Sequence, residues 1–340
     1  MKPSLFAFPG LAMWACLALT SLVTEAAELK HAKLMSADYD AIAGRYIVQF
    51  KKNNSLAGKT FAHSVQQALS NNGVEIKETI NHRIFSGASI DITDVGESAL
   101  KPILDREDVE AIYPVRRIYH ASTSGVAPSV KNESYIGKRL FAEKRKTPEK
   151  QVDDFNIPLV LGQVDQVHSK LGYKGKGILV GIIDSVYANC PQLGLDYMHP
   201  ALGGGFGKGY KVVAGYDLVG DAFDFDMEPQ PDADPYDSCS TSADSISDQL
   251  LCTPVLILIS KAHATHIAGI IAGYSEKQGF TGVAPEASLG IWRVFGCQGS
   301  TSSDMMIKAM LMAYDAGVDI ISMSISYNYL RYGYGGVEAV

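Results

Sequence analysis

The chain has 340 residues, of which 46% are hydrophobic and 20% are charged. These proportions exclude a disordered chain, and the length allows two domains, or one large domain with processing segments. The net charge is −7, and Lys and Arg form no long block, so the sequence gives no reason to expect a nucleic-acid partner.

Residues 1–27 have the three parts of a secretory signal peptide. Lys2 gives a positive start, a short apolar core follows, and small residues near Ala26 give a cleavage-like end. The apolar core is too short to span a bilayer, although an N-terminal membrane anchor is the alternative interpretation. We therefore predict a secreted protein that has no membrane association after signal cleavage.

Secretion permits disulfide bonds. Removal of the signal, which contains Cys16, leaves four cysteines that can pair in three ways, and the sequence does not choose among these pairings. The four are Cys190, Cys239, Cys252 and Cys297.

Residues 28–120 form the first predicted unit, a small α+β domain. β-Branched and aromatic runs predict strands, and apolar residues at helical spacing predict helices between them. The expected strands lie at residues 45–50, 84–92 and 109–115, and the expected helices at residues 60–72 and 98–104.

Residues 121–154 have the composition of a linker, rich in Ser, Thr, Gly, Pro and Lys. Basic clusters at residues 138–139 and 144–146 fit either a proteolytic processing site or a solvated tether, and the sequence favours neither.

Residues 155–340 form the second predicted unit, an α/β domain with a doubly wound parallel sheet. Almost continuous apolar runs predict strands that are covered on both faces, as parallel strands are. They lie at residues 178–183, 287–295 and 318–325. A helix expected at residues 303–316, closed by Gly317, makes a βαβ unit of the last two runs.

Asp184 and His263 are the candidate catalytic residues of this unit. Asp184 ends the first apolar strand, at the edge where parallel sheets build their sites, and a carboxylate there can fix the tautomer of a histidine. His263 begins a segment of small and apolar residues that predicts a buried helix, and an imidazole can act as a general base. Taken singly, each residue also fits a structural role: Asp184 as a turn cap, His263 as a satisfied core histidine.

Two metal sites are alternatives. Zinc at His263 and His266 is disfavoured, because a catalytic zinc helix has the pattern H-E-x-x-H and no Glu lies between them. Six aspartates at residues 221–237 could supply oxygen ligands to a structural calcium ion, but they lack EF-hand spacing, and a solvated loop is the favoured interpretation.

Four motifs follow one another along this unit. Residues 183–185 and 194–200 supply, in two pieces, I-D-[ST]-G-[IVL]-D-Y-x-H-P, and residues 282–287 look like G-V-A-P-x-A. Residues 263–269 follow H-G-T-H-[VI]-A-G except at Ala264, and residues 322–326 resemble N-M-S-L-G. Together they resemble the subtilisin-like serine proteases, or subtilases, in which an aspartate precedes the histidine in the chain.

The resemblance implies a secreted serine endopeptidase with Asp184 and His263 as catalytic residues. It implies that Ser324, Ile325 and Ser326 lie on a strand whose backbone pairs with an extended protein or peptide substrate. Residues 28–120 resemble the family's inhibitory propeptide, which assists folding and then occupies the active-site cleft, so the chain's own propeptide is an expected partner. We expect a monomer that needs no cofactor.

The sequence departs from the family pattern beside both catalytic motifs. Segments 186–193 and 240–261 are inserts, and we hypothesise that they are translated intron or mis-spliced sequence. Each insert brings one cysteine, which leaves Cys239 and Cys297 as a plausible pair. Ala264 and Ser326 replace glycines of the family motifs; an alanine at 264 is tolerable only if the backbone there is helical.

No G-T-S-M-A motif, the family's source of the serine nucleophile, follows His263. We therefore expect the chain to be the front part of a protease, truncated at its C-terminus and inactive by itself. A propeptide-type inhibitor or folding module, or a non-functional truncated product, is the alternative.

Overall fold

A computed structural model gives the architecture of the protein. It describes residues 31–36, 40–51, 74–93, 96–120, 157–184, 196–236, 263–297 and 300–326. The predicted signal peptide, the helix expected at residues 60–72, the linker, both inserts and the stretch from residue 327 onward lie outside the described residues. So do Cys190, Cys239 and Cys252.

The first unit contains an antiparallel sheet whose strands are in the spatial order β4-β1-β3-β2. The strands are β1 (Ala41–Phe50), β2 (Glu75–Asn81), β3 (Ser86–Asp91) and β4 (Val109–His120). Two short helices, η1 (Glu97–Leu100) and α2 (Lys101–Leu104), pack against the sheet. Leu100 and Leu104 meet Val48, Ile90 and Ile112 in one core, so apolar burial holds the helices to the sheet.

Strand β2 is not predicted by the sequence. Its residues Glu75, Lys77 and Glu78 interrupt any apolar run, and its side chains alternate between exposed positions and partly or fully buried ones. Among the described strands it pairs only with β3, and charged side chains are typical of such an edge position.

The second unit contains a parallel sheet in the order β11-β5-β9-β6, which confirms the predicted α/β class. Its strands are β5 (Leu179–Asp184), β6 (Val212–Asp217), β9 (Ser288–Arg293) and β11 (Ile320–Met323). The apolar run expected at residues 318–325 is divided at Ser324, after which β12 (Ile325–Ser326) begins. β6 is not predicted, because Gly215 and Tyr216 break its short apolar run.

Helices α8 (His263–Ala272) and α9 (Ser303–Asp315) cover opposite faces of this sheet. Ala264, Ala268 and Ala272 recur at intervals of four and are buried against the strands, because small side chains at that spacing let a helix lie close to a sheet. The opposite side of α8 is open, with Ile270 exposed. The helix is therefore buried on the face that carries these three alanines.

Helix α9 connects β9 to β11, although β5 lies between these two strands in the sheet. Met305, Met306, Ala309 and Ala313 form its buried face. The helix ends where Gly317 adopts a positive φ of 78°, as the sequence predicts.

Shorter elements complete the described part of the second unit. They are α4 (Ile157–Leu161), α5 (Val164–Gln166), η3 (Val167–Leu171), η4 (Pro200–Leu202), the hairpin β7 (Tyr274–Ser275) with β8 (Phe280–Thr281), and β10 (Thr301–Ser302). Within the described ranges, no helix has the length and apolar character needed to cross a membrane.

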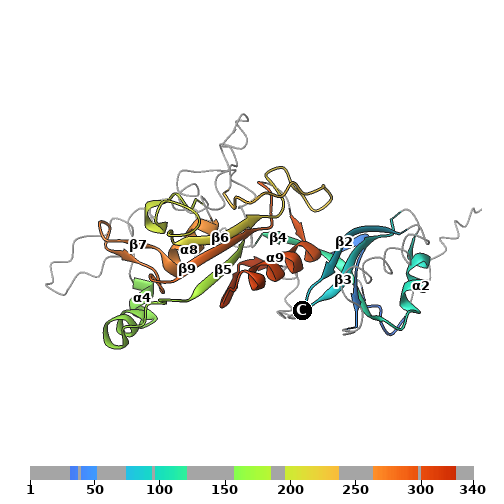
Figure 1. Ribbon diagram of the computed structural model, residues 1–340, viewed down its shortest axis with the longest axis horizontal. Helices are drawn as coiled ribbons and strands as arrows, with labels where there is room; N and C mark the ends of the chain where they lie inside the picture. The colour runs from blue at the N-terminus through green and yellow to red at the C-terminus, as the bar shows by residue number, and fades with distance from the viewer. Residues whose placement is uncertain are drawn as a thin grey trace, which may run out of the picture.

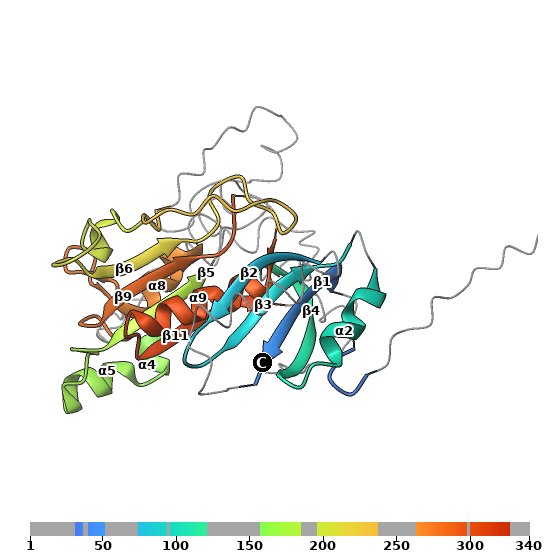
Figure 2. The ribbon, with the colours of Figure 1, turned by 45° about the vertical axis from the view of Figure 1, so that its right-hand side comes forward.

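Strand β4 belongs to both units. Its first part pairs with β1, and its last four residues pair with β10 and β12 of the second unit. Helix α9 lies between the antiparallel sheet and the parallel sheet in both views (Figures 1 and 2). Ile118 of β4 joins the core formed by α9, β5 and β9, so the units share apolar packing as well as backbone hydrogen bonds.

Candidate active site

The structure brings Asp184 and His263 together. Asp184 is the last residue of β5, and His263 is the first residue of α8. The imidazole Nδ1 lies 3.0 Å from Oδ1 and 3.1 Å from Oδ2 of the carboxylate. A carboxylate only accepts hydrogen bonds, so Nδ1 carries the proton and donates it, which leaves Nε2 of a neutral imidazole as an acceptor.

Burial differs sharply between the two partners. The side chain of Asp184 is 1% exposed and that of His263 is 28% exposed. The hydrogen bond from Asp184 raises the pKa of His263, its charge adds to this, and burial of the ring opposes it. The net effect is a raised pKa, so the carboxylate stabilises the imidazolium form. Among the described residues, Nε2 has no hydrogen-bond partner.

The backbone around His263 is compatible with Ala264. Ala264 is helical and buried, so it needs no glycine conformation. The second piece of the acid motif also contacts this helix, because the backbone N–H of Asp196 donates a hydrogen bond of 2.7 Å to Oγ1 of Thr265. The second half of the divided motif thus reaches the histidine helix.

The end of β4 lies between two strands of the second unit. Arg117 and Ile118 pair with Ser302 and Thr301 of β10, and Tyr119 and His120 pair with Ser326 and Ile325 of β12, all antiparallel. Two of the three residues predicted to hold an extended substrate, Ile325 and Ser326, therefore hold an extended segment of the same chain. The third, Ser324, lies immediately before β12.

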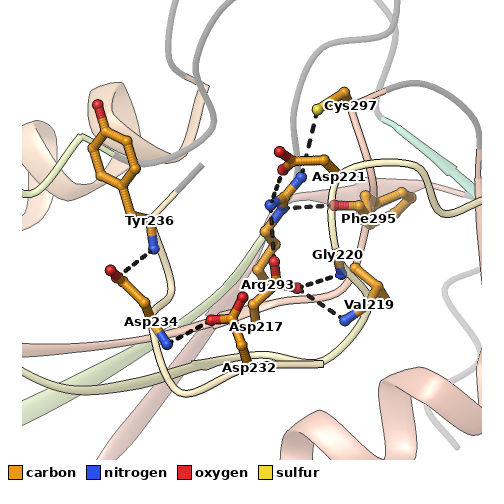
Figure 3. Close-up of polar contacts among 10 residues, drawn as sticks. All are labelled: Asp217, Val219, Gly220, Asp221, Asp232, Asp234, Tyr236, Arg293, Phe295 and Cys297. Atoms are coloured by element: carbon orange, nitrogen blue, oxygen red, sulfur yellow. Dashed lines mark hydrogen bonds and ion pairs between the residues drawn. The ribbon is translucent and has the colours of Figure 1, made fainter. Parts of the chain in front are cut away.

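A second charged cluster occupies the same edge of the parallel sheet (Figure 3). Arg293, at the end of β9, is aligned with Asp184 on one side and with Asp217 on the other. Its Nη1 lies 2.8 Å from Oδ2 of Asp217 and 2.6 Å from Oδ1 of Asp221. Its Nε donates a hydrogen bond to the carbonyl oxygen of Phe295.

Asp217 is held on both carboxylate oxygens. Oδ1 accepts hydrogen bonds from the N–H groups of Val219 and Gly220, both of 2.8 Å. Burial raises the pKa of Asp217, and the charge of Arg293 with these two hydrogen bonds only partly opposes that increase. The sequence patterns do not predict this cluster. The available signal was an arginine at the end of an apolar strand, level with a strand-end aspartate.

Carboxylates of the acidic loop after β6 accept hydrogen bonds from donors within the protein. Asp221 pairs with Arg293, and Asp224 accepts from Ser300. Asp234 accepts hydrogen bonds from the hydroxyl of Tyr197 and from the N–H of Tyr236. Burial, reinforced by Asp234, raises the pKa of Tyr197 to about 12.

Neither metal alternative has a complete set of ligands among the described residues. Within the described ranges, no three or more His, Cys, Asp or Glu side chains are arranged to hold a metal ion. His266 is exposed, whereas His263 contacts Asp184. Asp237, the last aspartate of the acidic stretch, lies outside the described residues.

Cys297 is part of a disulfide bond, and Nη2 of Arg293 lies 3.7 Å from its Sγ. The other four cysteines of the chain lie outside the described residues. The pairing of Cys297 with Cys239 therefore stays a prediction.

Comparison with known proteins agrees with the resemblance in the motifs. Residues 175–335 match the model of the subtilase family. The chain is 29% identical over 243 residues to the minor extracellular protease Vpr of Bacillus subtilis, covering 72% of this chain and 23% of Vpr. It is 32% identical over 155 residues to the major intracellular serine protease of the same species, covering 45% of this chain and 35% of that protein.

Subtilisin DY of Bacillus licheniformis is 27% identical over 176 residues, a match that covers 52% of this chain and 45% of the subtilisin. The chain thus spans less than half the length of each of these relatives. Over residues 175–335 the chain is similar to the subtilase family, and the relatives named here are proteases, one of them named as a serine protease.

Proposed function

We propose that this chain carries part of the catalytic machinery of a secreted serine endopeptidase of the subtilisin type. The observation that carries the proposal is the 3.0 Å contact between Asp184 and Nδ1 of His263. In the proposed mechanism, Nε2 of His263 takes the proton from a serine hydroxyl as that oxygen attacks a peptide carbonyl. Asp184 keeps the imidazole in the required tautomer and stabilises the imidazolium that forms.

The proposal assigns the substrate to the strand position beside β12. Ile325 and Ser326 have backbone groups that already pair with an extended segment in antiparallel fashion. A protein or peptide substrate would use the same groups, because main-chain pairing recognises any extended chain and leaves side-chain pockets to provide specificity. This mechanism needs no cofactor.

We propose that residues 28–120 act as the propeptide and the chain's own partner. Support comes from the end of β4, which pairs with β12 and so excludes another peptide from that strand position. Secretion is proposed from residues 1–27 and from the likeness to an extracellular relative. Fusing residues 1–27 to a reporter enzyme tests this part, since the reporter must leave the cell.

We propose that the 340-residue polypeptide has no peptidase activity by itself. The nucleophile of the family lies in a G-T-S-M-A motif, and no such motif follows His263 in this sequence. Removing the nucleophile of a catalytic triad lowers kcat by roughly a millionfold. Incubation with casein should give no turnover, and a serine-directed phosphonate should label nothing; labelling of any serine contradicts this part.

The endopeptidase function is tested by supplying the motif. If the transcript encodes an in-frame G-T-S-M-A segment further downstream, the chain extended through that segment should hydrolyse casein. His263→Ala and Asp184→Asn should each abolish most of this activity, whereas His266→Ala, on the same helix, should preserve it. Equal activity of the His263→Ala variant would show that this histidine is not the general base. The same transcript, by retaining or lacking codons 186–193 and 240–261, decides whether the inserts are genuine.

A further inference from the structure

The side chain of Arg117, on β4, contacts three residues of the second unit. Its Nε lies 2.5 Å from Oγ of Ser300, and its Nη2 lies 3.5 Å from Oδ2 of Asp224. Its guanidinium carbon lies 4.1 Å from the centre of the Phe225 ring, within the range of a cation–π contact. A cationic side chain is therefore held by a carboxylate, a hydroxyl and an aromatic face together.

The receiving residues are fixed by contacts of their own. Oδ1 of Asp224 accepts hydrogen bonds from the N–H of Phe225, the N–H of Ser300 and the hydroxyl of Ser300, at 2.8, 2.8 and 2.7 Å. Burial raises the pKa of Asp224, but the hydrogen bonds from Ser300 and Phe225 and the charge of Arg117 outweigh it, so the net pKa is lowered. Asp224 is held as a carboxylate whose second oxygen faces the guanidinium.

Ser300, Asp224 and Phe225 come from two different loops. The carbonyl oxygen of Phe225 accepts a 2.7 Å hydrogen bond from Nη1 of Arg45, which steadies the loop without using the aromatic ring. Ser300 is buried, with 1% of its surface exposed. These three residues are therefore a preorganised set of contacts, in contrast to a chance pairing of two mobile surface charges.

Arg117 belongs to the stretch that lies in the substrate position. It pairs with Ser302 of β10, and the next residue, Ile118, pairs with Thr301 and is fully buried in the core between α9 and the sheet. Neighbouring residues on a strand point to opposite sides. The segment paired with β10 and β12 thus presents an apolar side chain on one side and a basic side chain on the other.

We propose that Asp224, Phe225 and Ser300 form a subsite for a basic side chain of the substrate. The substrates it favours are extended peptides with arginine, or lysine, directly before an apolar residue, and Arg117-Ile118 is the built-in occupant. This inference rests on the proposed function, because it takes the position of β4 as that of a substrate.

The test uses peptide binding to the full chain with its own segment displaced. In the variant Ile118→Asp, a carboxylate in place of a buried isoleucine expels the end of β4 from the apolar core. The first unit stays attached through Asp304 of α9, whose Oδ2 lies 3.0 Å from Nη2 of Arg45 and accepts from the hydroxyl of Ser89. Binding of dye-labelled peptides is then followed by fluorescence anisotropy.

Three hexapeptides are compared: the sequence of residues 115–120, the same peptide with Arg117→Ala, and the same peptide with Arg116→Ala. The two alanine peptides carry equal net charge, so general electrostatic attraction cannot distinguish them. We expect the Arg117→Ala peptide to bind roughly tenfold more weakly than the Arg116→Ala peptide, since it lacks both the ion pair and the cation–π contact.

Variants of the subsite provide the second comparison. Adding Asp224→Asn to the Ile118→Asp chain should reduce the difference in affinity between the two alanine peptides to roughly twofold or less. Adding Asp226→Asn, on the same loop, should leave the tenfold difference unchanged. A lysine in place of the arginine should restore part of the affinity, because it keeps the charge but not the planar fork.

Equal affinity of the two alanine peptides overturns the subsite while the chain still binds peptides, so the proposed function survives. If neither these peptides nor the unaltered one binds, the substrate position itself is wrong and both proposals fall. If Ile118→Asp does not fold, a double-mutant cycle replaces it in the native chain. Arg117→Ala and Asp224→Asn should each speed amide hydrogen exchange at Tyr119 several-fold, with non-additive effects; additive effects overturn the subsite.

Discussion

Two pairs of an acid and a base lie side by side at one edge of the parallel sheet, and they differ in how far the base is exposed to solvent. Asp184, Arg293 and Asp217 end β5, β9 and β6 at the same level of the sheet. Arg293 and Asp217 are 5% and 2% exposed and are enclosed by further partners, whereas His263 of the other pair is 28% exposed.

The difference separates a structural pair from a reactive one. The guanidinium of Arg293 is shared among Asp217, Asp221 and the carbonyl oxygen of Phe295. Within the described residues, His263 binds Asp184 through Nδ1 and leaves Nε2 to accept another proton, so the imidazole can change charge while it keeps its hydrogen bond to Asp184. Burial and charge are therefore poor guides to function unless one atom remains available for chemistry.

The largest effect is expected at the enclosed pair. Arg293→Met leaves the buried carboxylate of Asp217 without its cation, and breaking a buried pair in this way destabilises a fold by about 3–5 kcal/mol. Urea unfolding followed by circular dichroism measures the loss. The double variant Arg293→Met with Asp217→Leu should recover part of the stability, and no loss in the single variant would show that the cluster is not structural.

A smaller effect is expected where the backbone supports Asp217. Gly220 has a φ of +81°, its N–H donates to Asp217, and a Cβ added there would lie 2.7 Å from the carbonyl oxygen of Gln230. Gly220→Ala should therefore cost about 1–3 kcal/mol in the free energy of unfolding. Gly209→Ala is the matched control for the conformation, because Gly209 also has a positive φ but has open space around its Cβ position.

In the pair of Asp184 and His263, we expect the substitution Asp184→Asn to lower the pKa of His263. The folded pKa of this histidine is raised above its unfolded value of about 6.5. The stability that the pair contributes is therefore fully present below pH 6.5 and is lost as the pH rises through the folded pKa. Asp184→Asn should cost about 1–2 kcal/mol at pH 5 and less at pH 9.

The measurement combines an NMR titration of the His263 Cε1 proton with unfolding at both pH values. The His263→Ala chain assigns the resonance. A cost of Asp184→Asn that grows as the pH rises would contradict the assigned direction of the pKa shift.

The smallest effect is expected at an exposed pair between the units. Lys308 of α9 lies 2.8 Å from Glu78 of β2, and their side chains are 34% and 31% exposed. Lys308→Ala should change the free energy of unfolding by about 0.5 kcal/mol or less, since exposed pairs are solvated in both states. If Lys308→Ala lowered the free energy of unfolding as much as Arg293→Met, the exposure of an ion pair would not determine its contribution to stability.

Much of the fold follows from local patterns. The apolar run that ends at Asp184 becomes β5, and the periodic residues 303–316 become α9, because a strand or helix buried against a core must repeat its apolar positions. The apolar pattern does not predict β2 or β6. Charged residues on β2 and Gly215 in β6 hide their periodicity, and pairing with neighbouring strands fixes both.

The candidate site is also predicted from the sequence only in part. The placement of Asp184 and His263 follows from a strand end and a helix start that point to one sheet edge. The position of Arg117 does not follow, since the sequence predicts a strand only as far as Val115. Residues 117–120 are extended because β10 and β12, distant in sequence, pair with them.

The sharing of β4 between two sheets has a consequence for biosynthesis. β4 is made before most of the second unit, and β12 is among the last of the described elements to leave the ribosome. The pairing of Ser326 with Tyr119 must therefore close a very long loop, which is the slow kind of contact in folding. Once formed, this pairing joins the sheet that is synthesised first to the strand that is synthesised last. Separation of the two units then exposes the apolar core around Ile118.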